Sequence, residues 1–161
     1  MKVLISAASK YGSTREIAEE IGTILRERGL EVAVASPEEV SSVEDHDAVI
    51  MGSAVYAGHW LKPARELADR EAEAISGKPV WLFSSGPIGE PPKPEEDPVD
   101  VGEIAERTNA REHRVFPGKL DRARLSFGEK AIVMALRAPE GDFRDWDDVR
   151  AWAGAIADAL G

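Results

Sequence analysis

The chain contains no cysteine, and this absence removes several kinds of chemistry. Disulfide bonds, thiolate metal sites and cysteine nucleophiles are excluded, so any redox activity must come from a bound cofactor. Histidine is nearly as scarce, because His46, His59 and His113 are the only three and are widely spaced. They lack the local pairing of metal ligands, so we expect no metal ion to be bound.

Basic residues are also in short supply. Lys and Arg number 20 against 30 Asp and Glu, which gives a formal net charge of -10. This excess of negative charge repels a phosphate backbone, so we expect no nucleic-acid partner. The acidic surface serves either simple solubility, the favoured explanation, or steering toward a basic redox partner.

Long apolar runs are absent as well. No stretch approaches the length that spans a membrane, and the predicted first strand begins by Val3, which leaves no room for a signal peptide. We therefore expect a cytoplasmic protein without a transmembrane segment. A length of 161 residues and a hydrophobic fraction of 43% suit one packed domain over residues 1–161.

Several common functional motifs are missing too. The chain has no Gly-x-Ser-x-Gly elbow, no Gly-x-Gly-x-x-Gly finger and no lysine-bearing P-loop, which disfavours hydrolase, nicotinamide-dependent and NTPase functions. Asp142, Asp145, Asp147 and Asp148 form an acidic group. They lack the glycine and terminal glutamate of a calcium loop and fit the start of a helix instead.

Strand and helix patterns alternate along the chain. Val3-Leu4-Ile5 predicts a first strand, and apolar residues at helical spacing predict a helix that ends at Gly29. A short second strand follows around 32–35. Continuous apolar runs at 48–51 and 79–83 predict two strands buried on both faces. Such strands belong to a parallel sheet covered by helices.

Further elements complete the predicted architecture. A helix begins near Pro63 and ends near Gly77, another spans about 99–110, and a strand lies around 114–116. Proline and glutamate dominate residues 87–98, which predicts a surface loop. The last helix opens at Asp145 and buries one apolar face. This face consists of Val149, Trp152, Ala153, Ile156 and Leu160.

The segment Ser9-Lys10-Tyr11-Gly12-Ser13-Thr14 joins the first strand directly to the first helix. Unpaired N–H groups and the positive dipole end at a helix N-terminus favour a bound phosphate. The hydroxyls of Ser9, Ser13 and Thr14 supply donors, and Gly12 lets the backbone approach a ligand. The same residues fit an ordinary helix start, with Ser13 as N-cap and Glu16 completing a capping box. Taken alone, the residues favour neither interpretation.

Two other predicted strands also end in small or hydroxyl-bearing residues. Ligands of open α/β sheets bind beyond the carboxyl ends of the strands, so we expect one shared pocket. Tyr56 and Trp60 either stack on a planar ring or anchor their segment to the core, whereas Trp81 is assigned to the core. His59 either relays a proton or is idle. The two segments are Ser53, Ala54, Val55, Tyr56, Ala57, Gly58, His59 and Trp60, and Ser84, Ser85, Gly86 and Pro87.

This combination resembles the flavodoxin-like family over essentially the whole chain. Ser9-x-x-Gly12-x-Thr14 is similar to the family's phosphate loop, although Lys10-Tyr11 replaces the second hydroxyl-bearing residue common in short electron-carrier flavodoxins. The resemblance implies noncovalently bound FMN, held by the loops after the first, third and fourth strands. It also implies an α/β sandwich whose five-stranded parallel sheet has the order 2-1-3-4-5.

The chain is more closely similar to the menaquinone-dependent protoporphyrinogen oxidase branch, which carries an added segment before the last helix. Residues 118–144 fill that position. The apolar run 131–136 within them is either a helix, capped by Ser126 and Glu129, or a strand. In the favoured role, the segment covers the sheet edge or forms a homodimer contact. In the alternative role, it docks a quinone, a porphyrin or a membrane face. Basic residues would help such docking: Lys119, Arg122, Arg124 and Lys130.

The branch implies an FMN-dependent oxidoreductase whose flavin N5 takes a hydride equivalent from a donor and passes electrons to an acceptor such as a quinone. Protoporphyrinogen is the donor that the resemblance names. Two alternatives stay open: a non-enzymatic FMN electron carrier, and a flavin-free binding or regulatory domain. The sequence assigns no catalytic residue.

Overall fold

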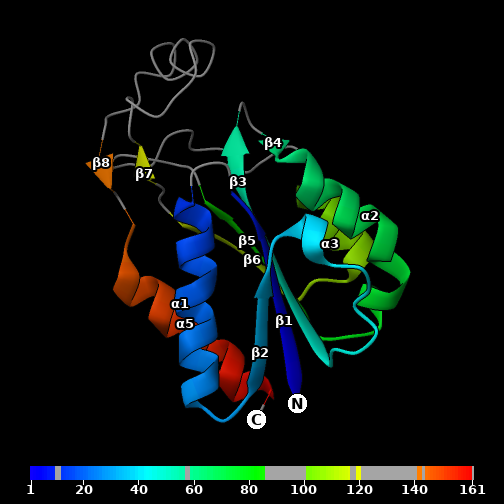
Figure 1. Ribbon diagram of the computed structural model, residues 1–161, viewed down its shortest axis with the longest axis horizontal. Helices are drawn as coiled ribbons and strands as arrows, with labels where there is room; N and C mark the ends of the chain where they lie inside the picture. Colours follow the sequence, from blue (N-terminus) through cyan, green and yellow to red (C-terminus); the bar gives the residue numbers. More distant parts are fainter. Residues whose placement is uncertain are drawn as a thin grey trace.

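The computed structural model describes residues 1–9, 12–56, 59–85, 101–116, 119–120, 141–142 and 144–160. At its centre is a parallel sheet in the order β2-β1-β3-β5-β6 (Figure 1). A short strand, β4 (His59–Trp60), pairs antiparallel with the end of β3. Without β4, the order is the predicted 2-1-3-4-5, so the predicted fold is confirmed. The parallel strands are β1 (Lys2–Ala8), β2 (Glu31–Ala35), β3 (Ala48–Tyr56), β5 (Val80–Ser85) and β6 (Glu112–Phe116).

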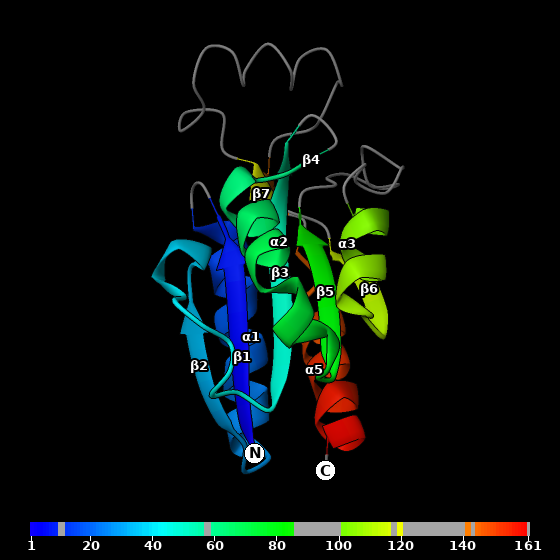
Figure 2. The same ribbon diagram turned by 90° about the vertical axis from the view of Figure 1, so that its right-hand side faces the viewer.

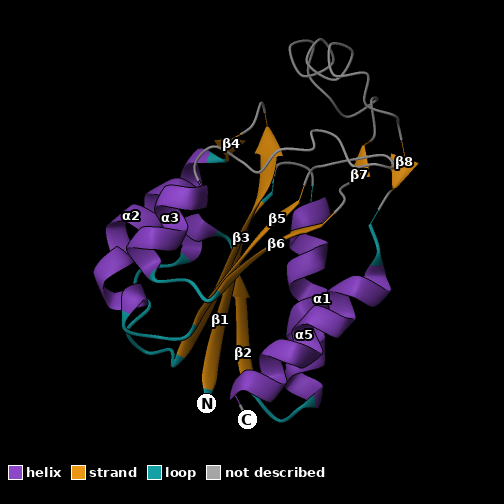
Figure 3. Ribbon diagram, turned by 180° about the vertical axis from the view of Figure 1, so that it is seen from behind, coloured by secondary structure: helices purple, strands orange, loops and turns teal. Residues whose placement is uncertain are grey.

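Helices cover both faces of the sheet. On one face α1 (Ser13–Glu27) lies beside α5 (Trp146–Leu160), and on the other α2 (Lys62–Ser76) lies beside α3 (Val101–Thr108) (Figure 3). A short 3-10 helix, η1 (Pro37–Glu39), follows β2. Each face has its own apolar core, because the strands are buried on both sides and each helix presents one apolar stripe. The predicted elements are therefore present, with shifts of a few residues at their ends.

The core under α1 and α5 is built around three aromatic rings. Phe83 packs against Phe116 and Trp152 with centroid distances of 6.1 Å for both pairs, and Phe116 and Trp152 are 5.5 Å apart. Gly52 is the cross-strand partner of Phe83, and a Cβ at Gly52 would stand 2.3 Å from Phe83 Cζ. Glycine at this position is what allows the phenyl ring to lie over β3. Trp81 is 5% exposed, as expected for a core residue.

Hydrogen bonds at the helix ends explain where α1 and α5 end and begin. Gly29 has a φ of 88°, and the N–H of Leu30 donates to the carbonyl of Leu25 at 3.2 Å. This is the glycine-terminated helix end that the sequence predicts. At the start of α5, the Asp145 carboxylate accepts a hydrogen bond from the N–H of Asp148 at 3.1 Å. Asp145 therefore caps α5, which confirms the predicted opening of the last helix.

The two ends of the predicted added segment form a small sheet of their own. Strands β7 (Lys119–Leu120) and β8 (Gly141–Asp142) pair antiparallel. The run 131–136, with its proposed caps, lies outside the described residues, as do Arg122, Arg124, Lys130 and the predicted loop 87–98. No helix among the described residues is long and apolar enough to cross a membrane.

Candidate functional site

The carboxyl ends of β1, β3 and β5 point to one edge of the sheet (Figure 2). At this edge the register pairs Ala8 with Ser53, and Ser53 with Ser84. Ser9 directly follows the paired end of β1. The structure thus places the beginnings of all three predicted segments next to one another.

Two of these segments contain strand residues where loops were predicted. β3 continues through Tyr56, β5 continues through Ser85, and His59 and Trp60 return along β3 as β4. The prediction of loops at Ser53–Tyr56 and at Ser84–Ser85 is wrong. Its cause is physical: small residues often mark a strand end, but here pairing with neighbouring strands continues past them. Backbone groups of this edge are therefore held by sheet hydrogen bonds.

The turn after β1 is shaped by Gly12. Gly12 has a φ of 88°, its N–H donates to Ser9 Oγ at 2.9 Å, and its carbonyl accepts from the N–H of Glu16 at 3.0 Å. Gly12 is the N-cap of α1, and no side chain caps this helix. The predicted capping box, with Ser13 as N-cap, is therefore wrong. Ser13 is instead the first helical residue, and the N–H groups of the first turn keep their capacity to bind an anion.

Thr14 adds an unusual feature to the same turn. It is 1% exposed, and its Oγ1 has no hydrogen-bond partner among the described residues. Leaving a buried hydroxyl unpaired costs about 1–3 kcal/mol, so such a group calls for an explanation. Ser9 Oγ accepts a bond from Gly12 and still has its own proton to donate. The turn therefore offers hydroxyl donors beside free backbone N–H groups.

A cavity of about 150 Å³ adjoins this turn. Gly12 and Leu61, the N-caps of α1 and α2, both line it, and neither helix has a side-chain cap. Two positive helix ends therefore face one small space. A single water needs only about 10–15 Å³ of such space, so the cavity can take a phosphate-sized group. The remaining lining residues are Ala7, Ala8, Ser9, Arg15, Ser36, Glu38 and Pro63.

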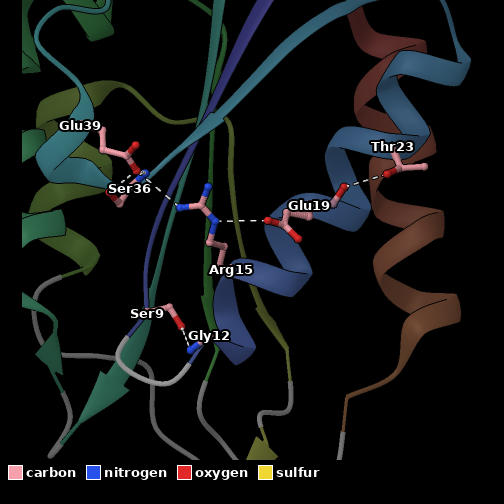
Figure 4. A network of polar contacts seen from close by, with 7 residues as sticks. All are labelled: Ser9, Gly12, Arg15, Glu19, Thr23, Ser36 and Glu39. Atoms are coloured by element: carbon pink, nitrogen blue, oxygen red, sulfur yellow. Dashed lines mark hydrogen bonds and ion pairs between the residues drawn. The ribbon is translucent and has the colours of Figure 1, made fainter.

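Arg15 connects α1 to η1 beside the cavity (Figure 4). Its Nε lies 3.2 Å from Glu19 Oε1, and its Nη1 lies 3.5 Å from Glu39 Oε1. The hydroxyl and N–H of Ser36 donate to the same Glu39 oxygen at 2.6 and 3.0 Å. These bonds from Ser36, with a smaller contribution from Arg15, hold the pKa of Glu39 below its ordinary value. The carboxylate in turn keeps Arg15 close to the cavity.

Trp60 belongs to the core. It is 1% exposed, and its indole N–H donates to Ser84 Oγ at 2.7 Å. The same hydroxyl lies 2.7 Å from His113 Nε2 on β6. The alternative in which Trp60 anchors its segment therefore holds in this structure, and its ring presents no open face for stacking. The chain from Trp60 through Ser84 to His113 fastens β4 to β5 and β6.

Ser53 secures the start of α2 in a similar way. Its Oγ accepts from the N–H of Leu61 at 2.9 Å and donates to the carbonyl of Ala54 at 2.7 Å. His59 is exposed on β4. The remaining predicted site residues, Lys10, Tyr11, Ala57, Gly58, Gly86 and Pro87, and the side chain of Tyr56, lie outside the described residues.

Sequence reasoning missed several residues near the site, among them Arg15, Ser36, Leu61 and His113. Arg15 could have been recognised from the sequence, because a cation in the first turn of a helix is unfavourable next to the positive end of the helix dipole. The other three reach the site only through tertiary packing. Within the part of the chain that the structure describes, no group of three or more His, Asp or Glu side chains could hold a metal ion.

A family model described as a flavodoxin domain matches residues 4–147. The chain therefore belongs to the flavodoxin domain family. Protoporphyrinogen IX dehydrogenase (quinone) of Escherichia coli strain K12 is 26% identical over 174 residues, with 98% of this chain and 95% of the relative covered. The predicted resemblance to the family and to this branch is confirmed.

Two solved flavodoxins share the fold. A flavodoxin from the domain Archaea gives a TM-score of 0.71 at 18% identity and covers 99% of each chain. Oxidised flavodoxin 1 from Bacillus cereus gives a TM-score of 0.69 at 16% identity and covers 100% of each chain. At these identities the likeness concerns the fold alone.

Proposed function

We propose that the chain binds FMN noncovalently at the carboxyl edge of its sheet and acts as a flavin-dependent oxidoreductase. The proposed donor is a porphyrinogen-type molecule, and the proposed acceptor is a quinone. The observation that carries the proposal is the cavity lined by the N-caps of α1 and α2. Thr14 follows the lining residue Gly12 in the same turn by two positions, and its buried hydroxyl has no hydrogen-bond partner among the described residues. The nearly full-length similarity to a quinone-linked protoporphyrinogen IX dehydrogenase supports the reaction class.

The residues present suit a phosphate group. A phosphate dianion would give the buried Thr14 hydroxyl an acceptor and would use the free N–H groups of the first turn of α1. The Ser9 hydroxyl can donate to the same anion. Pockets for cofactor-sized ligands measure about 300–1,000 Å³, so a cavity of about 150 Å³ suits one end of the nucleotide. We propose that segments 54–60 and 84–87 hold the ring end.

When bound, the flavin supplies two-electron redox chemistry that no side chain of this chain possesses. The protein orients it. The bonds from Trp60 to Ser84 and from Leu61 to Ser53 keep β4 and the start of α2 in place. Backbone groups at the ends of β3 and β5 are thereby positioned before a ligand arrives, which reduces the ordering cost of binding. His59, exposed at this edge, is the side chain we propose to exchange a proton with the substrate.

The first test is the visible absorbance spectrum of the purified protein after incubation with FMN and gel filtration. A retained flavin spectrum supports the proposal. A colourless protein that rejects FMN contradicts it and favours a flavin-free binding domain.

Two substitutions test the phosphate turn. Ser9→Ala combined with Thr14→Ala removes two hydroxyl donors, and we expect FMN to bind at least about tenfold more weakly, since hydrogen bonds to charged groups contribute about 1.5–3 kcal/mol each. Thr23→Ala is the matched control, because Thr23 lies on the same helix and its hydroxyl donates to the carbonyl of Glu19 at 3.0 Å. Equal FMN affinities for all three proteins would rule out the assigned hydroxyl contacts.

Steady-state turnover separates the enzyme from an electron carrier. We expect the holoprotein to oxidise protoporphyrinogen with menaquinone as acceptor. A protein that retains FMN but shows no such turnover, and that stabilises the one-electron-reduced flavin, would be an electron carrier. The proposal includes a cytoplasmic location and peripheral contact with the membrane that holds the quinone.

A further inference from the structure

One buried hydroxyl joins three strands near the candidate site. Ser84 Oγ lies 2.7 Å from Trp60 Nε1 on β4 and 2.7 Å from His113 Nε2 on β6. Ser84 is 0% exposed, and these two atoms are its hydrogen-bond partners among the described residues. Trp60 and His113 have further interactions of their own. The three side chains therefore form one polar chain with the Ser84 hydroxyl at its centre.

The donors and acceptors in this polar chain fix the direction of its hydrogen bonds. A hydroxyl has one proton to donate and two lone pairs, whereas an indole N–H can only donate. Ser84 therefore accepts from Trp60, and its own proton finds its acceptor in His113 Nε2. A proton on Nε2 would make this nitrogen a second donor and leave the Ser84 proton without an acceptor among the described residues. Because a buried unpaired proton is unfavourable, the chain favours a His113 imidazole that carries its proton on Nδ1.

Trp60 lies where this polar chain can influence a ligand. It ends β4, which pairs with the end of β3, and it directly precedes Leu61, which lines the cavity. Ser53 and Ser84 are register partners on neighbouring strands, and each binds one of these two consecutive residues. Ser53 holds Leu61 at the wall of the cavity, whereas Ser84 holds Trp60 in the segment proposed for the ring end. The two ends of the proposed ligand are thus supported by different serines.

We propose that His113 is a positioning residue for the ring end of the bound flavin. This inference rests on the proposed function. His113 acts through Ser84: by accepting the hydroxyl proton, it turns an oxygen lone pair toward the Trp60 N–H. Hydrogen bonds in such a chain polarise one another, so the bond from Trp60 is stronger with His113 as acceptor than without it. β4 is thereby held in one position before a flavin binds, which lowers the ordering cost of binding.

Two substitutions of His113 separate loss of the acceptor from loss of the imidazole ring. His113→Leu removes the acceptor, so the Ser84 proton loses its partner. His113→Gln supplies an amide oxygen as acceptor and should restore the bond. Arg114→Met is the matched control, because Arg114 follows His113 on β6 and its Nη1 lies 3.3 Å from Asp148 Oδ1 on α5. This variant loses a polar bond of the same strand on the opposite face of the sheet, since successive side chains alternate between faces.

The experiment measures dissociation constants of riboflavin, FMN and inorganic phosphate for the wild type and these variants. We expect His113→Leu to weaken riboflavin and FMN by the same factor, about fivefold, which corresponds to one hydrogen bond. Phosphate affinity should stay unchanged, because Ser53 holds Leu61 at the cavity independently of His113. His113→Gln should recover most of the loss, and Arg114→Met should match the wild type. Circular dichroism of each variant verifies folding.

Nuclear magnetic resonance of the ligand-free protein tests the polar chain itself. The indole N–H resonance of Trp60, assigned with Trp60→Phe, should move upfield in His113→Leu and return toward its wild-type position in His113→Gln. The nitrogen shifts of the wild-type His113 imidazole should show a proton on Nδ1 and none on Nε2. An unmoved Trp60 resonance in folded His113→Leu, or a proton on Nε2 in the wild type, would overturn the inference.

The remaining outcomes also decide. If folded His113→Leu binds riboflavin as well as the wild type does, or loses phosphate affinity to the same extent, the inference is overturned while retained flavin keeps the proposed function. If the wild type binds neither flavin, the proposed function is overturned, and the ring-end role of His113 is overturned with it. If His113→Leu does not fold, the imidazole nitrogen shifts and the flavin affinities of His113→Gln decide: a proton on Nδ1 with near wild-type affinities supports the inference, and any other result overturns it.

Discussion

Gly52 offers a sharp test of how the core supports the site. It lies opposite Phe83 in the β3–β5 pair, and a Cβ at this position would stand 2.3 Å from Cζ of that ring. Carbon atoms in favourable contact are about 3.5–4.0 Å apart, so the Gly52→Ala variant must move the ring by more than about 1 Å. The ring has no free space to enter, because Phe83 and Phe116 are 0% exposed and Trp152 is 2% exposed.

The cost of Gly52→Ala follows from these contacts. Overpacking of a core costs about 1–3 kcal/mol, and the two aromatic pairs of Phe83 contribute about 0.5–1.5 kcal/mol each. We expect the free energy of unfolding to fall by about 3 kcal/mol. This is a large part of the total, which is about 5–15 kcal/mol for native proteins. For a chain of this size the melting temperature should fall by about 6–12 °C. Ser84 follows Phe83 directly, so weaker FMN binding should accompany the loss.

Urea unfolding followed by circular dichroism measures this effect. The double variant Gly52→Ala with Phe83→Leu should lose less stability than the sum of the losses in the two single variants. The reason is that leucine removes the ring that meets the new methyl group. Gly102→Ala in α3 is the control, since no atom lies within 4 Å of a Cβ there. It should be neutral or stabilise by up to about 1 kcal/mol. A Gly52→Ala protein within about 0.5 kcal/mol of the wild type would refute the packing argument.

Three further predictions concern the site. Ser84→Ala leaves the buried Trp60 N–H without its acceptor and should cost about 1–3 kcal/mol in urea unfolding; unchanged stability and an unchanged near-ultraviolet spectrum would contradict this. Gly12→Ala and Gly29→Ala should each lower the free energy of unfolding by about 1–2 kcal/mol, because both residues have a φ of 88°. Only the Gly12 variant should weaken FMN binding. Equal FMN affinities of the two variants would contradict the proposal that the turn after β1 binds FMN. Ser36 lowers the pKa of Glu39, so this carboxylate stabilises the fold above its unfolded-state pKa and loses that contribution as pH falls through the lower folded value. Ser36→Ala should raise the Glu39 pKa in an NMR titration, and an unshifted titration would exclude the assigned cause.

Most of the fold was predictable, because its signals are local. The apolar spacing of 17–25, the runs at 48–51 and 79–83, and the glycine after the first helix each fix one element from nearby residues. The limits of β3 and β5 were not predictable in this way. Ser53 and Ser84 look like the start of loops, yet pairing between distant strands decides that they belong to the sheet.

The candidate site was predictable in its position and less so in its bonds. A hydroxyl-rich turn between a strand and a helix shows up in the sequence, but the left-handed conformation that makes Gly12 the N-cap does not. Trp60 could stack or anchor on sequence evidence, and only its bond to Ser84 on another strand decides between the two roles. The close approach of Gly52 and Phe83 likewise depends on register, which no local pattern reports.

A chain with a net charge of -10 has to overcome its own field to hold a phosphate dianion. At physiological salt, surface charges are screened over about 8 Å, so most exposed acids contribute little at the turn after β1. The groups close to that turn are different in kind: the free N–H groups of α1 and the cavity shared with the start of α2. An extended polyanion needs many such contacts and meets the acidic surface, whereas one recessed phosphate needs only these. We therefore expect the chain to disfavour nucleic acid while the proposed site still binds a single phosphate group.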